Sequence, residues 1–141
     1  CSSDLAFDFG YNHGIFAPDE VIRLFPRLEV KWEHKVHERP VCKLPKQKLS
    51  GILMHYTYDS WQQWLDKAGQ YTSIWAEDNF SKGKRVGKSA AFTHGIYGFI
   101  RAYFLQLGFL DGWAGLYSSL QHFFYTLLKY WKLYELQQKN K

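Results

Sequence analysis

Alternating polar and apolar positions mark the clearest strand that the sequence predicts. From residue 30 to residue 37, charged or polar side chains occupy every odd position and mostly apolar ones occupy the even positions, as in a half-buried strand. A continuously apolar run at residues 51–56 ends at His55-Tyr56 and favours a strand buried on both faces. A further strand is predicted at residues 21–25, whereas Pro40 and Pro45 make residues 39–48 irregular or an edge segment.

The second half of the chain has helical periodicity instead. Apolar residues that recur every three or four positions predict helices at residues 60–82, at residues 89–107, and from just after Gly115 to the end. Asp59-Ser60 offers a cap for the first of them. The sequence therefore predicts an α+β fold, with a few strands followed by about three helices. One face of the last helix is expected to be apolar, through Leu116, Leu120, Phe123, Leu127, Trp131 and Tyr134.

Positive charge is concentrated in the helical half. The chain of 141 residues has a formal net charge of +5, and residues 82–141 hold nine Lys or Arg against two acidic residues, which gives +7 for this part. Many aromatic residues lie in the same region, a combination that suggests an anionic surface as partner. The apolar run at residues 90–110 contains Arg101, which argues against a membrane span and favours a helix lying in the membrane interface. The alternative is that these aromatic side chains pack onto another part of the protein or onto a partner chain.

Several short motifs occur in a definite order along the chain. They are Ile22-Arg23-Leu24-Phe25-Pro26-Arg27, Val36-His37-Glu38, His55-Tyr56-Thr57-Tyr58, Lys67 and Tyr71, Gly83-Lys84-Arg85, and Gly108-Phe109-Leu110-Asp111-Gly112. In this order they resemble the C-terminal half of bacterial family 2 glycosyltransferases that build the lipopolysaccharide core, of the β-1,4-glucosyltransferase type. The resemblance runs from about residue 20 to the end of the chain.

The resemblance implies an arrangement of domains. Residues 1–20 are expected to be an N-terminal loop remnant, in which residues 1–5 are a candidate for foreign sequence because one frame of a common sequencing adaptor would encode them. Residues 21–58 would form the strand-rich end of a GT-A catalytic domain, and residues 59–141 a helical C-terminal region at the membrane interface. The nucleotide-binding half with its Asp-x-Asp motif is missing, so we expect this fragment alone to be inactive.

The same resemblance implies catalytic roles at the ends of two strands. Glu38, beside His37, would be the base that takes a proton from the acceptor hydroxyl in an inverting transfer. From spacing alone, a surface Glu38 paired with Arg39 or Lys35 is favoured, and the family resemblance reverses that preference. A zinc hydrolase is excluded, because the residues after His37-Glu38 do not continue as His-Glu-x-x-His.

A divalent cation, Mg²⁺ or Mn²⁺, is the expected cofactor, held mainly by the missing N-terminal half. His55 would contribute to that metal site, the alternative being a buried histidine bonded to a backbone carbonyl. Lys84 and Arg85 would bind the phosphate of donor or acceptor, although a solvated interhelix loop also explains them. Tyr56 and Tyr58 would stack on an acceptor sugar.

The expected function is therefore transfer of a hexose from a nucleotide sugar to a lipopolysaccharide core or similar glycolipid. The enzyme would be cytoplasmic and peripheral on the inner membrane. The alternative is a non-catalytic, basic and aromatic module that binds anionic lipid or nucleic acid. We expect no nucleic-acid partner, because recognised RNA-binding motifs are missing.

Overall fold

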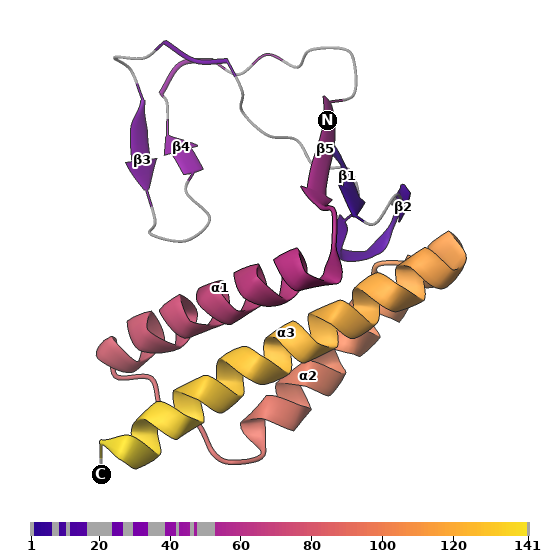
Figure 1. The fold of residues 1–141 in the computed structure, drawn as a ribbon. Coiled ribbons are helices and arrows are strands. Elements are labelled where there is room, and N and C mark those ends of the chain that lie inside the picture. The colour runs from indigo at the N-terminus through magenta and orange to yellow at the C-terminus, as the bar shows by residue number, and fades with distance from the viewer. Residues whose placement is uncertain are drawn as a thin grey trace.

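The computed structural model describes residues 2–6, 9–10, 12–16, 24–26, 30–33, 39–41, 43–45, 47 and 53–140. Strands come first and helices follow, as predicted (Figure 1). The elements, in chain order, are β1 (Ser2–Ala6), β2 (Phe9–Gly10), the 3-10 turn η1 (Gly14–Phe16), β3 (Lys31–Glu33), β4 (Arg39–Val41), β5 (Leu53–Tyr58), α1 (Trp61–Ser81), α2 (Ala90–Ile100), the π-helical turn η2 (Arg101–Leu105), the 3-10 turn η3 (Gly108–Asp111) and α3 (Gly112–Lys139).

The described strands form two small sheets. In the first, β1 lies between β2 and β5; it pairs parallel with β5, where Ser2 is opposite Leu53 and Leu5 opposite Tyr56. In the second, β3 pairs antiparallel with β4, and Pro40 lies opposite Trp32. A proline in a strand with a single described neighbour fits the expected edge segment.

Strand boundaries differ from the predicted ones. Residues 2–6 and 9–10 form strands within the segment interpreted as a loop remnant, because β1 finds its partner in the distant β5 rather than in neighbouring sequence. No strand covers the described residues 24–26, and β3 occupies residues 31–33 of the predicted strand at 30–37, so that it begins one residue later than expected. Residues 21–23 and 34–38 lie outside the described residues.

Helix α1 agrees closely with its prediction. The Ser60 hydroxyl accepts a hydrogen bond from the Gln63 backbone N–H at 3.2 Å, which confirms the expected cap. After the helix, Gly83 has φ +81°, a left-handed conformation that glycine adopts without steric cost. The chain then turns toward α2.

The ends of the other two helices differ from the prediction. Helix α2 ends at Ile100 and continues as η2, and Leu107 rather than Gly108 takes the left-handed conformation, with φ +58°. Helix α3 begins at Gly112, before Gly115 instead of after it. Gly115 does not stop a helix, because its role is close packing: a Cβ there would overlap the Gly108 carbonyl.

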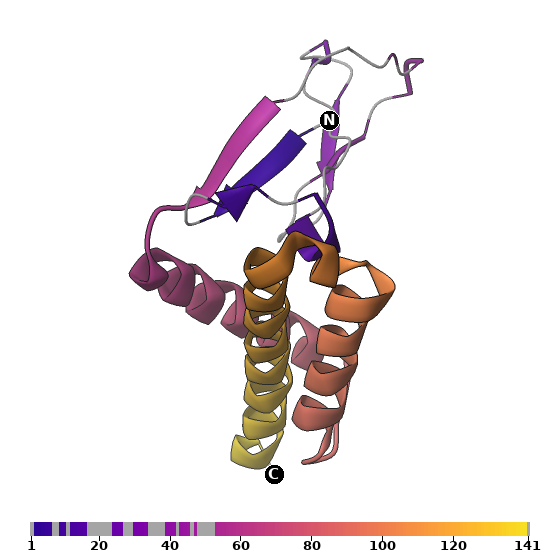
Figure 2. The same ribbon diagram turned by 90° about the vertical axis from the view of Figure 1, so that its right-hand side faces the viewer.

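Small residues form the contact between α2 and α3, which lie side by side (Figure 2). Gly95 and Gly98 of α2 are buried, and a Cβ on either would come within 3.1 Å of a side chain of α3. Ser118 and Ser119 of α3 are buried in the same way. The expected apolar stripe of α3 is therefore not its most buried face, and Leu120 and Trp131 on that stripe are 41% and 45% exposed.

Helix α1 packs on a different side of α3. Trp64 is buried, whereas Trp61 is half exposed and packs edge-on against Tyr117 of α3. The Lys132 ammonium of α3 donates to the Gly69 carbonyl and the Thr72 hydroxyl at 2.7 and 2.8 Å. This polar contact fixes α1 on α3.

None of the described helices is both long and apolar enough to cross a membrane.

Candidate functional site

The strand-end site predicted from the sequence centres on the junction between β5 and α1. His55 and Tyr56 lie in β5, and Tyr58 is its last residue. Only the Tyr58 side chain is described among these three: it is partly buried, and the Lys67 ammonium lies 5.0 Å from its ring centroid. A cation over an aromatic face is attracted by the ring quadrupole, so Lys67 helps to hold this tyrosine at the strand end.

The two proposed catalytic residues, His37 and Glu38, lie outside the described residues. Their roles therefore stay predictions. The same holds for the side chains of His55 and Tyr56, whose backbone alone is described. Within the described part of the chain, no three His, Cys, Asp or Glu side chains gather in a group that could hold a metal ion.

Arg85 is engaged at the end of α1. Its Nη1 donates to the Phe80 and Lys84 carbonyls at 3.1 and 2.9 Å, and its guanidinium carbon lies 4.2 Å from the centroid of the Phe80 ring. These contacts hold the guanidinium near the last carbonyls of α1, where positive charge is favourable. The side chain stays exposed, so its remaining N–H groups are open to solvent.

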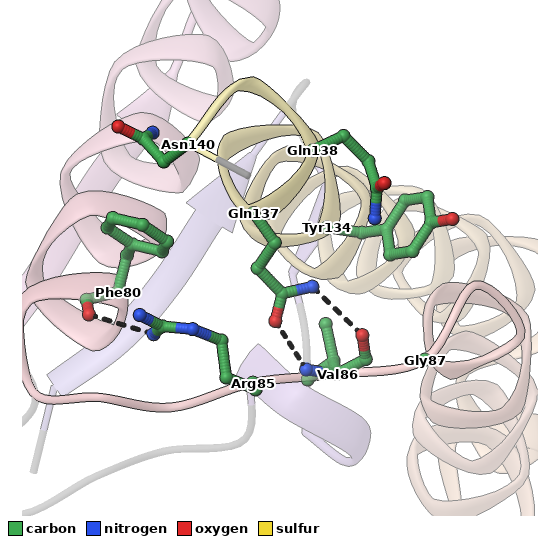
Figure 3. Close-up of a pocket in the computed structure, with 8 residues that line it drawn as sticks. All are labelled: Phe80, Arg85, Val86, Gly87, Tyr134, Gln137, Gln138 and Asn140. Atoms are coloured by element: carbon green, nitrogen blue, oxygen red, sulfur yellow. Dashed lines mark hydrogen bonds between the residues drawn. The ribbon is translucent and has the colours of Figure 1, made fainter.

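An open pocket of about 420 Å³ lies beside Arg85 (Figure 3). Gln137 of α3 forms one wall of this pocket and hydrogen-bonds the loop between α1 and α2. Its Oε1 accepts from the Val86 N–H at 2.6 Å, and its Nε2 donates to the Val86 carbonyl at 2.9 Å. This double contact fixes the loop between α1 and α2 on the end of α3. The pocket is lined by Phe80, Arg85, Val86, Gly87, Tyr134, Gln137, Gln138 and Asn140.

Lys84 points to different neighbours from those of Arg85. Its ammonium lies 4.9 Å from the Trp75 ring centroid and 5.1 Å from that of Tyr130. Lys129 shares both rings, at 5.1 and 5.7 Å. Lys84 and Arg85, which the sequence placed in one phosphate site, thus contact different aromatic rings, and Lys84 shares its two rings with Lys129.

A buried carboxylate ties the N-terminal segment to the helices. Asp111 accepts hydrogen bonds from the backbone N–H groups of Asn12 and His13 at 3.0 and 2.8 Å, and one of its oxygens lies 2.8 Å from His13 Nδ1. Burial alone would raise the pKa of Asp111, but the bonds from His13 and Asn12 lower it overall. This anchor positions the segment that follows β2.

Sequence reasoning did not place Lys129 beside Lys84, and it missed the His13–Asp111 pair. Asp111 belongs to a motif that was noted, but its partner is far away in the chain, so no local pattern relates the two. Lys129 interrupts an aromatic and aliphatic stretch of α3, Phe123 to Trp131, and that isolated charge is the one signal that pointed to it.

Comparison with curated proteins finds relatives in Rickettsia species. A Rickettsia typhi protein named uncharacterized glycosyltransferase is 33% identical over 93 residues, which is 66% of this chain and 32% of that protein. Its namesake in Rickettsia prowazekii is 33% identical over 92 residues, 65% of this chain and 32% of that protein. A third, from Rickettsia felis, is 32% identical over 93 residues, 66% of this chain and 33% of that protein.

The chain spans about a third of the length of these curated relatives. No protein-family model matches it, and no solved structure matches it significantly. The relatives support a connection with glycosyltransferases in general, and they do not distinguish the lipopolysaccharide-core type, the donor sugar or the acceptor.

Proposed function

We propose that this chain is part of a GT-A type, family 2 glycosyltransferase that transfers a hexose from a nucleotide sugar to a lipopolysaccharide core or similar glycolipid, with inversion. The observation that carries the proposal is the similarity, over two thirds of the chain, to Rickettsia proteins named as glycosyltransferases. The ordered motifs give independent support for the finer assignment. The parallel β1–β5 pair that leads into α1 is compatible with an α/β catalytic domain, in which ligands bind at the carboxyl ends of strands.

The proposed chemistry needs a base and a neutralised leaving group. Glu38 takes the proton from the acceptor hydroxyl as that oxygen attacks the anomeric carbon, and the bond from that carbon to the nucleotide diphosphate breaks. His37 lies beside this base in the sequence. Tyr58, held at the end of β5 by Lys67, offers a ring on which an acceptor sugar stacks, and Tyr56 is proposed to contribute in the same way.

A divalent cation would neutralise charge on the departing diphosphate. His55 is the contact that this chain would provide, and the described residues contain no complete set of ligands beside it. The remaining ligands would come from a nucleotide-binding segment outside this chain. We therefore assign to His55 a supporting contact only.

The acceptor is proposed to be reached from the membrane surface. Many large apolar side chains of α2, of the turns after it and of α3 are exposed, and they are here together called the outer face: Phe92, Ile96, Tyr97, Ile100, Phe104, Leu105, Leu107, Phe109, Leu110, Trp113, Leu120, Phe124 and Trp131. We propose that they form a contiguous patch, since large exposed apolar patches on soluble proteins mark interaction surfaces.

Charge complements this apolar surface. From residue 89 to residue 128 the only charged residues are Arg101 and Asp111, and Asp111 is engaged with His13. The loop that leads into α2 adds the cations Lys82, Lys84, Arg85 and Lys88. An apolar face flanked by cations favours binding to an anionic lipid surface, in keeping with a protein peripheral on the cytoplasmic side of the inner membrane.

The catalytic assignment is tested by Glu38→Gln in the gene product that carries this chain. We expect transfer to fall by a factor of at least about one hundred, because general-base catalysis typically contributes that much. Donor binding should change little, because the amide keeps the size of the carboxylate. Initial rates and donor dissociation constants are measured side by side, with Glu77→Gln on the exposed surface of α1 as the control.

Near-normal turnover in Glu38→Gln would overturn the base assignment. An absence of transfer in the unaltered protein, together with vesicle binding, would favour the non-catalytic lipid-binding module.

A further inference from the structure

Two lysine ammonium groups share one aromatic floor where the three long helices meet. Lys84 follows α1 and Lys129 lies on α3, and each is within 5.7 Å of the ring centroids of both Trp75 and Tyr130. On α2, the His94 ring stacks on Tyr130 with centroids 4.0 Å apart. The floor is therefore built from all three helices and holds both cations in a restricted region.

Neighbouring lysines differ from these two in having oxygen partners. Lys132 donates to three oxygens of α1, including the Ser73 hydroxyl at 2.9 Å. Lys82 pairs with Asp78, and Lys139 with Glu135, both at 2.6 Å. In the described part of the chain, by contrast, the contacts of the Lys84 and Lys129 ammonium groups are all with aromatic rings, and neither group has an ion pair with a carboxylate.

Holding the two cations together has an electrostatic cost. Burial lowers the pKa of Lys129, and the nearby positive charge of Lys84 lowers it further. Aromatic rings attract a cation but do not neutralise it. A bound anion would offset the repulsion between the two ammonium groups, and Lys84 is exposed, so an anion can approach from solvent.

We propose that Lys84 and Lys129 together bind a phosphate-bearing anion over the Trp75–Tyr130 floor. A phosphate or diphosphate group has enough oxygens to accept hydrogen bonds from both ammonium groups at once. The anion is either the diphosphate of a soluble nucleotide or a phosphate carried by a lipid, and the identification with donor or acceptor rests on the function proposed above. Lys129 replaces Arg85 as the partner of Lys84 in this site.

The first test measures binding of pyrophosphate to the full chain by isothermal titration calorimetry at constant ionic strength. We expect saturable binding that weakens at least about tenfold in Lys84→Gln and in Lys129→Gln, because each loses a charge-assisted hydrogen bond. Lys43→Gln is the control: it removes the same charge from an exposed residue outside the helices and should bind like the unaltered chain.

A second measurement distinguishes loss of anion binding from a structural effect of the Lys129 substitution. The pKa of Lys129, followed by NMR of its ε-carbon, should rise when pyrophosphate binds, because an anion favours the charged form. Lys129→Arg keeps the charge and should retain binding. These readouts do not need sugar transfer, so a failure of the Glu38 prediction leaves them unaffected, and their failure leaves the Glu38 test intact.

The lipid source is tested with vesicles of phosphatidylcholine with and without phosphatidic acid. Sedimentation that depends on phosphatidic acid and is lost in Lys84→Gln and Lys129→Gln, with no binding of pyrophosphate, would assign the site to a lipid phosphate. If these variants lose pyrophosphate binding but sediment with the vesicles like the unaltered chain, the site would be assigned to a soluble diphosphate. Equal effects of Lys84→Gln, Lys129→Gln and Lys43→Gln, or no binding of either probe, would overturn the proposal.

Discussion

At the scale of single residues, Asp111 shows how one carboxylate can organise a distant segment. Its side chain is only 6% exposed and accepts two backbone N–H bonds from residues 12 and 13, besides its contact with the His13 ring. Carboxylates bonded to several donors are stabilised in the charged form. The Gly108-Phe109-Leu110-Asp111-Gly112 motif could be recognised from the sequence, but this structural role could not, because His13 lies far from it along the chain.

The lowered pKa of Asp111 predicts a loss of stability in acid. Because the folded-state pKa lies below the unfolded value of about 3.8, the carboxylate contributes stability above that pH and loses it as pH falls through the folded pKa. Asp111→Asn should lower the free energy of unfolding by about 2 kcal/mol at neutral pH and make it less dependent on pH in acid. Urea unfolding across this range measures both effects.

Asp66→Asn is the control for this prediction, since Asp66 is an exposed carboxylate of α1 that accepts a bond from Gln62 within the same helix. It should change the unfolding free energy little, because such surface contacts contribute weakly. An Asp111→Asn variant as stable as the control at neutral pH would contradict the anchoring role.

At the scale of elements, the approach of α3 to the turn before it depends on the absence of side chains. Gly108 and Gly115 come so close that a Cβ on Gly115 would overlap the Gly108 carbonyl, and a Cβ on Gly108 would lie 2.7 Å from the Ala102 carbonyl oxygen. Leu107 meanwhile takes a left-handed conformation that is unfavourable for a bulky residue. The close packing of η2, η3 and α3 holds that strained turn in place.

We expect Gly115→Ala to destabilise the fold by about 1–3 kcal/mol, since the new methyl group meets backbone rather than a movable side chain. Gly69→Ala is the matched control: it also lies within a helix, but a Cβ there meets nothing within 4 Å. That variant should gain about 0.5–1 kcal/mol, because alanine favours helix over glycine. Denaturant unfolding followed by circular dichroism compares the two, and equal shifts would contradict the close-packing role of Gly115.

At the scale of the whole molecule, the outer face consists of large apolar side chains that remain exposed. Trp113 at the start of α3 is 83% exposed, and Phe124 on the same helix is 53% exposed. The buried residues of α2 are instead small, and those of α3 include Ala114, Gly115, Ser118 and Ser119 besides Tyr130 and Leu133. Many large apolar side chains of these two helices are thus exposed while many of the buried ones are small, which is unusual for a soluble helical bundle.

The exposure of large apolar side chains predicts which of them hold the chain on a lipid surface. Trp113→Ser and Phe124→Ser should each weaken sedimentation with phosphatidylglycerol vesicles about tenfold, because each removes a large apolar side chain from the buried contact. Leu65→Ser on α1 is the control, since Leu65 is 51% exposed but lies outside the outer face. Equal losses for Leu65→Ser and Trp113→Ser would contradict binding through the outer face.

The sequence by itself determined the class and order of elements. The period of three to four residues predicted α1 with its Ser60 cap, and it located the two later helices to within a few residues. These features follow from local hydrogen bonding and side-chain spacing, which neighbouring residues specify. The motifs also gave the glycosyltransferase hypothesis, with which the names of the relatives agree at the general level.

Tertiary structure alone decided the pairings between distant residues. It placed β1 against β5, joined Asp111 to His13, and set Lys84 and Lys129 on the same two aromatic rings. It also buried small residues of α3, Ser118 and Ser119 among them, rather than the expected apolar stripe. A periodic pattern shows that a helix has an apolar side, but the partner helix determines which side is buried, because close approach of two backbones requires residues with little or no side chain.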